Sequence, residues 1–235
     1  MTTVPRRSVL LGMAAAAVLS MLGPAACRDG GGVGDGDGRG ADEGLLAAAE
    51  AGDVAAVAAA LDDGAHIEAR DGRQRTALLL AATFDHVAVA ELLVERGADP
   101  DALDDRHDTP WLVTGVTGSV AMGRVLHAAG ADLTIRNRFG GISVIPASER
   151  GHVDYVRWVT TSTDIDVDHV NGLGWTALLE AVILGDGGPA HQEIVRLLLA
   201  AGADPSLADG EGVTALEHAR ARGHGELVAI LGAAG

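Results

Sequence analysis

The sequence predicts an all-α solenoid of about six helix-turn-helix repeats that are joined by short hairpin loops. Two short phrases recur in the same order along most of the chain, at a spacing close to 33 residues. Between them, apolar residues follow the period of a helix. Aromatic residues make up only 3% of the chain, so the core must consist of small aliphatic side chains, which suit thin, closely stacked helices.

The first phrase opens each unit with a residue that can cap a helix. Its copies are 33, 33, 34 and 38 residues apart and begin at Thr76, Thr109, Ile142, Thr176 and Thr214. A threonine before Ala or Pro is typical of an N-cap, because its hydroxyl accepts a free backbone N–H and the next residue needs no donor. We expect a short helix after each copy, which runs to Asp85 in the second unit and ends elsewhere through a left-handed glycine at Gly151, Gly185 or Gly223.

The second phrase closes each unit after a second helix. It reads Gly97-Ala98-Asp99, Gly130-Ala131-Asp132 and Gly202-Ala203-Asp204, and Gly64-Ala65 precedes them in the first unit. A second helix such as Val87 to Glu95 has Val89, Leu92 and Leu93 on one face. No helix pair of this kind can bury its apolar face alone, so the stack of pairs must form the core.

These two phase-locked phrases resemble the ankyrin repeat. The resemblance covers residues 42–235 in six units, numbered here 1 to 6: 42–70, 71–103, 104–136, 137–170, 171–208 and 209–235. Unit 4 has Ile142 in place of the capping threonine and Pro146 in the first turn of its helix, so we expect it to be the least stable unit. Unit 5 carries five extra residues, 186–190, which are predicted to form a surface loop.

The first 27 residues are predicted to be an export signal. Arg6 and Arg7 precede an apolar run that ends in small residues, and this segment resembles a twin-arginine signal of bacteria. Cys27 follows two alanines, where a bacterial lipoprotein carries its acylated cysteine, although Pro24 stands where an aliphatic residue is preferred. Cleavage without lipidation and an uncleaved anchor are the alternatives. Residues 28–41 are rich in Gly and Asp and are predicted to be a flexible linker.

The composition argues against several function classes. The chain has a formal net charge of -16, so it should repel nucleic acid and anionic lipid, and a lipid on Cys27 would be its only membrane contact. Four histidines recur at one position of the repeat, which favours a structural role over a metal site: His86, His152, His191 and His224. No phosphate-binding or dinucleotide-binding glycine motif and no nucleophile motif is present, so we expect no cofactor and no enzyme activity. Glu149 and Glu180 are the carboxylates that an enzyme hypothesis would use.

The resemblance implies that a protein partner meets the hairpin tips and the exposed side of the first helices. The residues carried over to these positions are Arg73, Arg75, Phe84, Arg106, Asp108, Arg136, Arg138, Phe139, Arg150, Leu173, Trp175 and Leu184. Arginine and aromatic side chains are frequent in interface hot spots. The alternative is that Phe84, Phe139 and Trp175 pad the loops against neighbouring repeats, whereas Trp111 and Trp158 are expected in the core.

The sequence therefore predicts a monomeric, non-enzymatic scaffold that binds a protein in the bacterial cell envelope. A role as immunity or stabilising partner of a co-exported enzyme is the alternative from another class.

Overall fold

A computed structural model describes residues 36–234 of the chain, and these residues form a single stack of helix pairs. The predicted signal with Cys27, and residues 28–35 of the predicted linker, lie outside the described residues. Each unit contributes one pair: α1 (Gly36–Ala51) and α2 (Val54–Asp62), α3 (Ala77–Thr83) and α4 (Val87–Glu95), α5 (Pro110–Thr117) and α6 (Val120–Ala128), α7 (Val144–Glu149) and α8 (Val153–Ser162), α9 (Ala177–Ile183) and α10 (Pro189–Ala200), α11 (Ala215–Arg222) and α12 (Gly225–Gly232).

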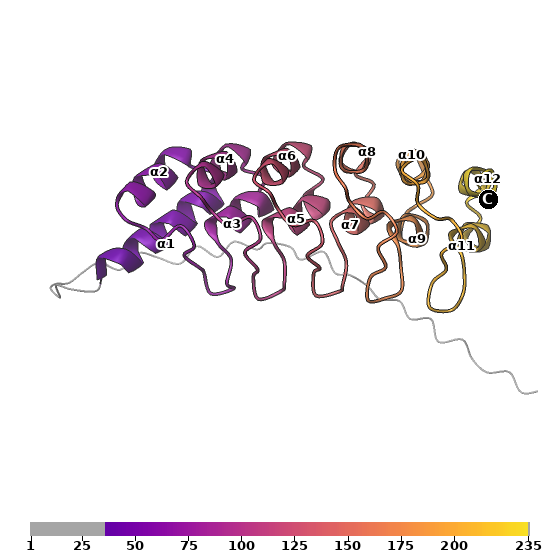
Figure 1. Cartoon of the computed structure of the whole chain (residues 1–235), viewed down its shortest axis with the longest axis horizontal. Helices are drawn as coiled ribbons and strands as arrows, with labels where there is room; N and C mark the ends of the chain where they lie inside the picture. The colour runs from indigo at the N-terminus through magenta and orange to yellow at the C-terminus, as the bar shows by residue number, and fades with distance from the viewer. Residues whose placement is uncertain (1–35, 235) are drawn as a thin grey trace, which may run out of the picture. The chain divides into compact units, whose positions relative to one another are not determined.

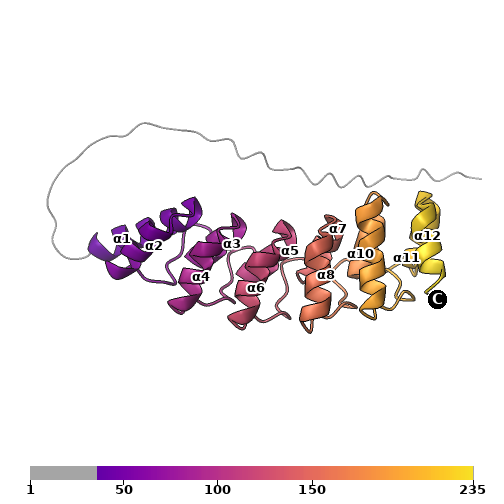
Figure 2. The same cartoon turned by 90° about the horizontal axis from the view of Figure 1, so that it is seen from above.

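The helices lie in two rows that follow the order of the chain (Figures 1 and 2). The first helix of every unit lies in one row and the second helix in the other, and the hairpins that join successive units all project beyond the first row. An isolated bridge between Ala208 and Thr214 is the extent of β pairing within residues 36–234. The all-α solenoid is therefore confirmed. None of the helices described is both long enough and apolar enough to cross a membrane.

Threonine caps begin four of the first helices, as predicted. The hydroxyls of Thr76, Thr109, Thr176 and Thr214 each accept the N–H three residues later. In unit 4, Ile142 has no such oxygen, and the N–H of Ile145 bonds instead to the Ile142 carbonyl at 3.1 Å. Helix α7 begins at Val144 without a side-chain cap, and Pro146 lies in its first turn, where a missing donor costs little.

The predicted ends of the first helices are confirmed in three units and wrong in one. Asp85, Gly151 and Gly223 adopt left-handed backbone angles, with φ of 58°, 76° and 73°. Gly185 is not left-handed, and in unit 5 the positive φ of 71° falls on Gly187. The reason is the insertion, which delays the turn into the second helix by two residues.

Two segments predicted as loops are partly helical. Helix α1 begins at Gly36, so residues 36–41 of the predicted linker belong to it. In unit 5, Pro189 is the first residue of α10, so the inserted segment supplies the start of a longer second helix as well as a loop. Proline is favoured there because it lacks the N–H that a first helical residue leaves unpaired. The carboxylate of Asp186 accepts the Gly188 N–H at 2.8 Å and closes the loop.

Large aromatic side chains occupy the core between units 3 and 4. Trp111 and Tyr155 are fully buried, and the ring centroids of Trp111 and Trp158 are 6.1 Å apart. The Thr114 and Tyr155 hydroxyls are hydrogen bonded at 2.7 Å across the junction. Gly123 leaves room for Trp158, because a Cβ there would come within 2.5 Å of the indole ring. The two tryptophans predicted in the core are confirmed.

At three junctions, a carboxylate in one unit accepts a hydrogen bond from a backbone N–H in the next unit. The bonds are 2.8–2.9 Å long and join Glu68 to Asp99, Asp101 to Asp132, and Asp168 to Asp204. The residue at the corresponding position in unit 3 is Thr134, which makes no bond to Asp166. The row of bonds is therefore interrupted between units 3 and 4, where the aromatic core contacts lie.

Replacing Asp168 with alanine is expected to lower the free energy of unfolding by about 1 kcal/mol, because the Asp204 N–H loses a charged acceptor. The matched control is Thr134→Ala at the equivalent position, which should cost less than about 0.5 kcal/mol. Urea unfolding followed by far-ultraviolet circular dichroism measures both variants. Equal losses would contradict a stabilising role for the carboxylate.

Candidate functional site

The hairpin tips have one recurring geometry, and this geometry positions the side chains that they present. Each tip begins with an Asp or Asn whose N–H bonds to the carbonyl four residues later at 3.0–3.1 Å. Its side-chain oxygen also accepts the N–H groups two and four residues later, at 2.8–3.0 Å. These residues are Asp71, Asp104, Asn137, Asn171 and Asp209. Such a turn holds its backbone in place whatever side chain its third residue carries.

The third residue of every tip is exposed, and its chemistry changes along the stack. This residue is Arg73, Arg106, Phe139, Leu173 and Glu211 in units 2 to 6. Phe139 is 45% exposed and Leu173 is 59% exposed. The tips thus present basic side chains in units 2 and 3, apolar ones in units 4 and 5, and an acidic one in unit 6.

The predicted arginines differ in how strongly the protein itself holds them. Arg75 pairs with Asp71 at 2.7 Å, and both side chains are largely buried. Arg106 and Arg138 approach the same carboxylate oxygen of Asp108 at 3.9 Å and 3.7 Å. Burial, together with the nearby charge of Asp104, raises the pKa of Asp108 despite these two arginines.

The other three predicted arginines make no ion pair with the side chains of residues 38–234. They are Arg73, Arg136 and Arg150, and all three are exposed. Arg138 has an additional contact, because its guanidinium lies 4.3 Å from the centroid of the Phe139 ring. The guanidinium of Arg138 therefore stacks on the Phe139 ring, and the two side chains form one exposed surface.

A hollow of about 240 Å³ lies between the tips of units 2 and 3. Leu79 on α3 and Val113 and Val116 on α5 supply its apolar lining, and Thr83 and Asp104 also contribute to its wall. Four of the predicted partner-binding residues lie around it: Arg73, Arg75, Arg106 and Asp108. The structure therefore brings these four predicted residues together.

Apolar side chains are also exposed where the first helices end. Phe84 is 44%, Val116 42% and Leu184 46% exposed, although all three are large and apolar. Trp175, in contrast, is half-buried and packs against the core. The padding interpretation therefore applies to Trp175, while Phe84 and Phe139 present nearly half of their surface to solvent.

The recurring histidines join neighbouring units. A ring nitrogen of His86, His152 and His191 lies 2.9–3.0 Å from a backbone carbonyl near the end of the preceding unit's first helix. His224 instead contacts Arg222 at 3.3 Å. His191 lies inside α10 rather than at its start, because the insertion lengthens that helix. Residues 36–234 hold no group of three potential metal ligands.

The fold strongly raises the pKa of Glu180, one of the two carboxylates that an enzyme hypothesis would use. It is 6% exposed, and its carboxylate accepts a hydrogen bond from the Asn171 amide at 2.8 Å. Burial, aided by the negative charge of Glu149, raises its pKa from 4.5 to about 7. The sequence analysis missed this, because the burial comes from neighbouring units and no local pattern reports it.

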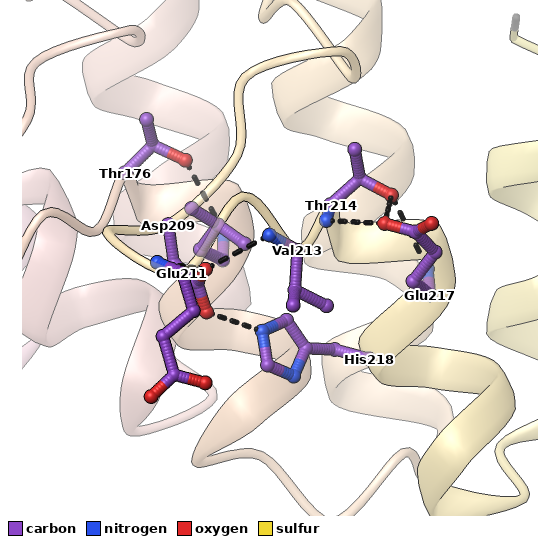
Figure 3. A network of polar contacts seen from close by, with 8 residues as sticks. Thr176, Asp209, Glu211, Val213, Thr214, Glu217 and His218 are labelled. Carbon is purple, nitrogen blue, oxygen red and sulfur yellow. Dashed lines mark hydrogen bonds and ion pairs between the residues drawn. The ribbon is translucent and has the colours of Figure 1, made fainter.

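The hydrogen bond between Asn171 and Glu180 joins the hairpin of unit 5 to its first helix, and a contact at the same position joins the hairpin of unit 6 to its first helix (Figure 3). His218 follows the tip residue Asp209 by nine positions, as Glu180 follows Asn171, and its ring nitrogen lies 2.7 Å from the Asp209 carboxylate. Hydrogen bonds from the Val213 N–H and from His218 lower the pKa of Asp209. Thr214 and Glu217 cap α11 reciprocally. Glu180 and His218 thus each anchor a tip through one side-chain hydrogen bond.

The comparison with protein families now identifies the repeat. Residues 114–209 and 146–235 match the family described as ankyrin repeats in three copies, and residues 45–94 match ankyrin repeats in many copies. This chain belongs to the ankyrin-repeat family. Ankyrin repeats generally mediate protein–protein interaction, and proteins of the family are typically non-enzymatic scaffolds.

Similar proteins come from several sources. A segment of 104 residues, 44% of this chain, is 49% identical to YahD of Escherichia coli (strain K12), whose name describes an ankyrin repeat protein; the match spans 52% of that relative. An ankyrin repeat domain from Acinetobacter baumannii AYE is 45% identical, with a TM-score of 0.77, over 81% of this chain and 96% of the other. The ankyrin repeat protein EF0377 is 35% identical, with a TM-score of 0.78, over 81% and 97%. The ankyrin repeat domain of Bcl-3 is 27% identical, with a TM-score of 0.72, over 82% and 86%.

Replacing Glu180 with glutamine is expected to stabilise the ankyrin stack at alkaline pH. The Glu180 carboxyl group of the folded wild type binds its proton more tightly than the same group in the unfolded chain. The wild type therefore loses stability as the pH rises from 4.5 to about 7. At pH 8 the variant should be more stable by up to roughly 3 kcal/mol, and the difference should vanish near pH 4.5. Urea unfolding at a series of pH values measures it. If the variant were no more stable than the wild type at pH 8, ionisation of Glu180 would not destabilise the folded protein.

Proposed function

We propose that this chain is a non-enzymatic scaffold that binds a protein partner along its hairpin tips and at the exposed ends of its first helices. The observation that carries the proposal is the row of tips, in which a fixed backbone presents one exposed side chain per unit. A surface of this kind offers many contacts without needing to fold on binding, which lowers the entropic cost of association.

The structure refines which of the predicted residues a partner would reach. Arg73, Arg106, Arg138, Phe139 and Leu173 are exposed on the tips, and Phe84 and Leu184 on the helix ends. Arg75 and Asp108 serve mainly to hold this surface, since one is paired with Asp71 and the other receives two arginines. Trp175 supports the tip of unit 5 from beneath. Arg136 is exposed on the hairpin of unit 4, and Arg150 is exposed at the end of α7.

The same proposal places the protein outside the cytoplasm of a bacterium. Its support is the sequence of residues 1–27, with the arginine pair and the apolar run of a twin-arginine signal. Cys27 would then carry a lipid and anchor the mature chain to the envelope.

A double substitution of Arg138 and Leu173 with alanine is expected to lower capture of the envelope partner at least about tenfold, because truncated hot-spot residues commonly cost more than 1 kcal/mol each. The full chain serves as bait in extracts of the source envelope, and quantitative mass spectrometry measures what is retained. The matched control replaces Arg196 and Val54, an arginine and an exposed aliphatic residue on second helices. Both variants must keep the helicity of the wild type.

Retention of one protein by the wild type and the control, with its loss from the tip variant, would support the scaffold. If every retained protein were bound equally by all three baits, the tips and helix ends would not be the binding surface.

Substituting lysine for both Arg6 and Arg7 is expected to leave the protein in the cytoplasm, because the twin-arginine route reads the arginine pair itself. Cell fractionation and immunoblotting measure this, with Arg28→Lys as the control outside the pair.

A radioactive fatty acid is expected to label the exported wild type, and a Cys27→Ser substitution should remove this labelling. Unchanged export of the lysine variant, or labelling that survives without Cys27, would refute the corresponding part of the proposal.

A further inference from the structure

Positive charge is concentrated on three consecutive hairpins of an otherwise acidic protein. Segments 70–76, 103–109 and 136–142 contain six arginines and four aspartates, while the chain as a whole has a net charge of -16. The next hairpin, 170–176, has no charged residue, and 208–214 contains only Asp209 and Glu211. Of these five hairpins, only the three that open units 2 to 4 contain arginine, and 103–109 taken alone holds one arginine and three aspartates.

Several of these guanidinium groups have donors to spare. Arg73 and Arg136 make no ion pair with the side chains of residues 38–234. Arg106 and Arg138 share the Asp108 carboxylate at 3.9 Å and 3.7 Å, which is longer than a hydrogen bond. A bidentate carboxylate would satisfy each of these forks better than its present surroundings do.

Neighbouring basic tips are held in fixed relation to each other. The Asp105 N–H donates to the Arg73 carbonyl at 3.1 Å, and the guanidinium of Arg70 reaches the Leu103 carbonyl. Asp108 draws Arg138 of the next unit toward the same place. The arginines therefore form a row across units 2 to 4, to which a chain lying along the stack could bind at several points.

The hollow between the first two tips adds an apolar contact. Its volume of about 240 Å³ is below the range of roughly 300–1,000 Å³ that is usual for small-molecule pockets. Leu79, Val113 and Val116 supply its apolar lining, and Arg73 and Arg106 are among the polar residues that also line it. A space of this size and character suits an apolar side chain of a bound segment better than an entire ligand.

We propose that the tips of units 2 to 4 bind an extended acidic segment of the partner protein. Its Asp or Glu carboxylates bind Arg73, Arg106 and Arg138, and one of its apolar side chains enters the hollow over Leu79, Val113 and Val116. This inference rests on the proposed scaffold function and specifies the chemistry of the partner. Charge complementarity carries it: these three hairpins together hold six arginines and four aspartates, whereas the whole chain holds 17 basic and 33 acidic residues.

A nucleic acid fits this surface less well than an acidic peptide. Four aspartates lie among the arginines, and the surrounding protein is strongly acidic. A phosphate backbone carries its charge uniformly and would be repelled at those positions, whereas a peptide can place carboxylates only where arginines stand.

The test measures binding of short fluorescent peptides to the full chain by fluorescence anisotropy. One set alternates Asp or Glu with Leu or Phe, a second set replaces every acid with Lys, and a third replaces it with Gln. The variant under test is Arg73→Gln with Arg106→Gln, which leaves the hollow's apolar lining intact. The matched control is Arg96→Gln with Arg196→Gln, which changes the net charge equally on exposed positions of units 2 and 5 away from the tips. A single-stranded DNA oligonucleotide is the fourth probe.

We expect the acidic set to bind the wild type and the control at least about tenfold more tightly than the Arg73 and Arg106 variant, and binding to weaken on raising NaCl from about 50 mM to about 300 mM. Absence of binding by every acidic peptide, or equal binding by the test variant, would overturn the inference. Binding of the basic or neutral set as tightly as the acidic set would also overturn it and would leave the scaffold function standing. DNA that binds and competes at the same arginines would replace the peptide as occupant.

Discussion

Burial of apolar surface between neighbouring units is the constraint on which the rest of this structure depends. A pair of helices as short as α3 and α4 cannot cover the apolar faces that Leu80 and Leu93 belong to, and these side chains are buried only because units 1 and 3 pack on either side. The units must therefore stack in register, and their hairpins come to lie side by side as a consequence. The row of tips therefore follows from the packing of the core.

Within each unit, local hydrogen bonds turn this stacking into an exact presentation of side chains. A threonine hydroxyl starts the helix, and one Asp or Asn oxygen holds the hairpin by accepting two N–H groups. The third residue of the tip takes part only through its backbone N–H, so its side chain can be that of Arg73, Phe139 or Glu211 without a change in the backbone. A single scaffold thereby displays basic, apolar and acidic surface in turn.

The features that the sequence predicted correctly are those that repeat or are decided locally. The caps at Thr76 and its equivalents, and the second helix from Val87 to Glu95, depend on residues a few positions apart. The raised pKa of Glu180 and the half-burial of Trp175 depend on what neighbouring units place against them, which no local pattern records. The first helix was predicted to start too late, since its glycines are typical of a linker, yet they are helical from Gly36.

The insertion in unit 5 shows where this architecture tolerates change. Its extra residues enter between α9 and α10, where they lengthen one helix and close a loop on Asp186. The bond from Asp168 to the Asp204 N–H still forms across the longer unit, and the tip at Asp209 keeps the geometry of the others. The extra length is absorbed at the turn between the two helices of the unit, so this repeat is longer than its neighbours while the hairpins on either side keep the same geometry.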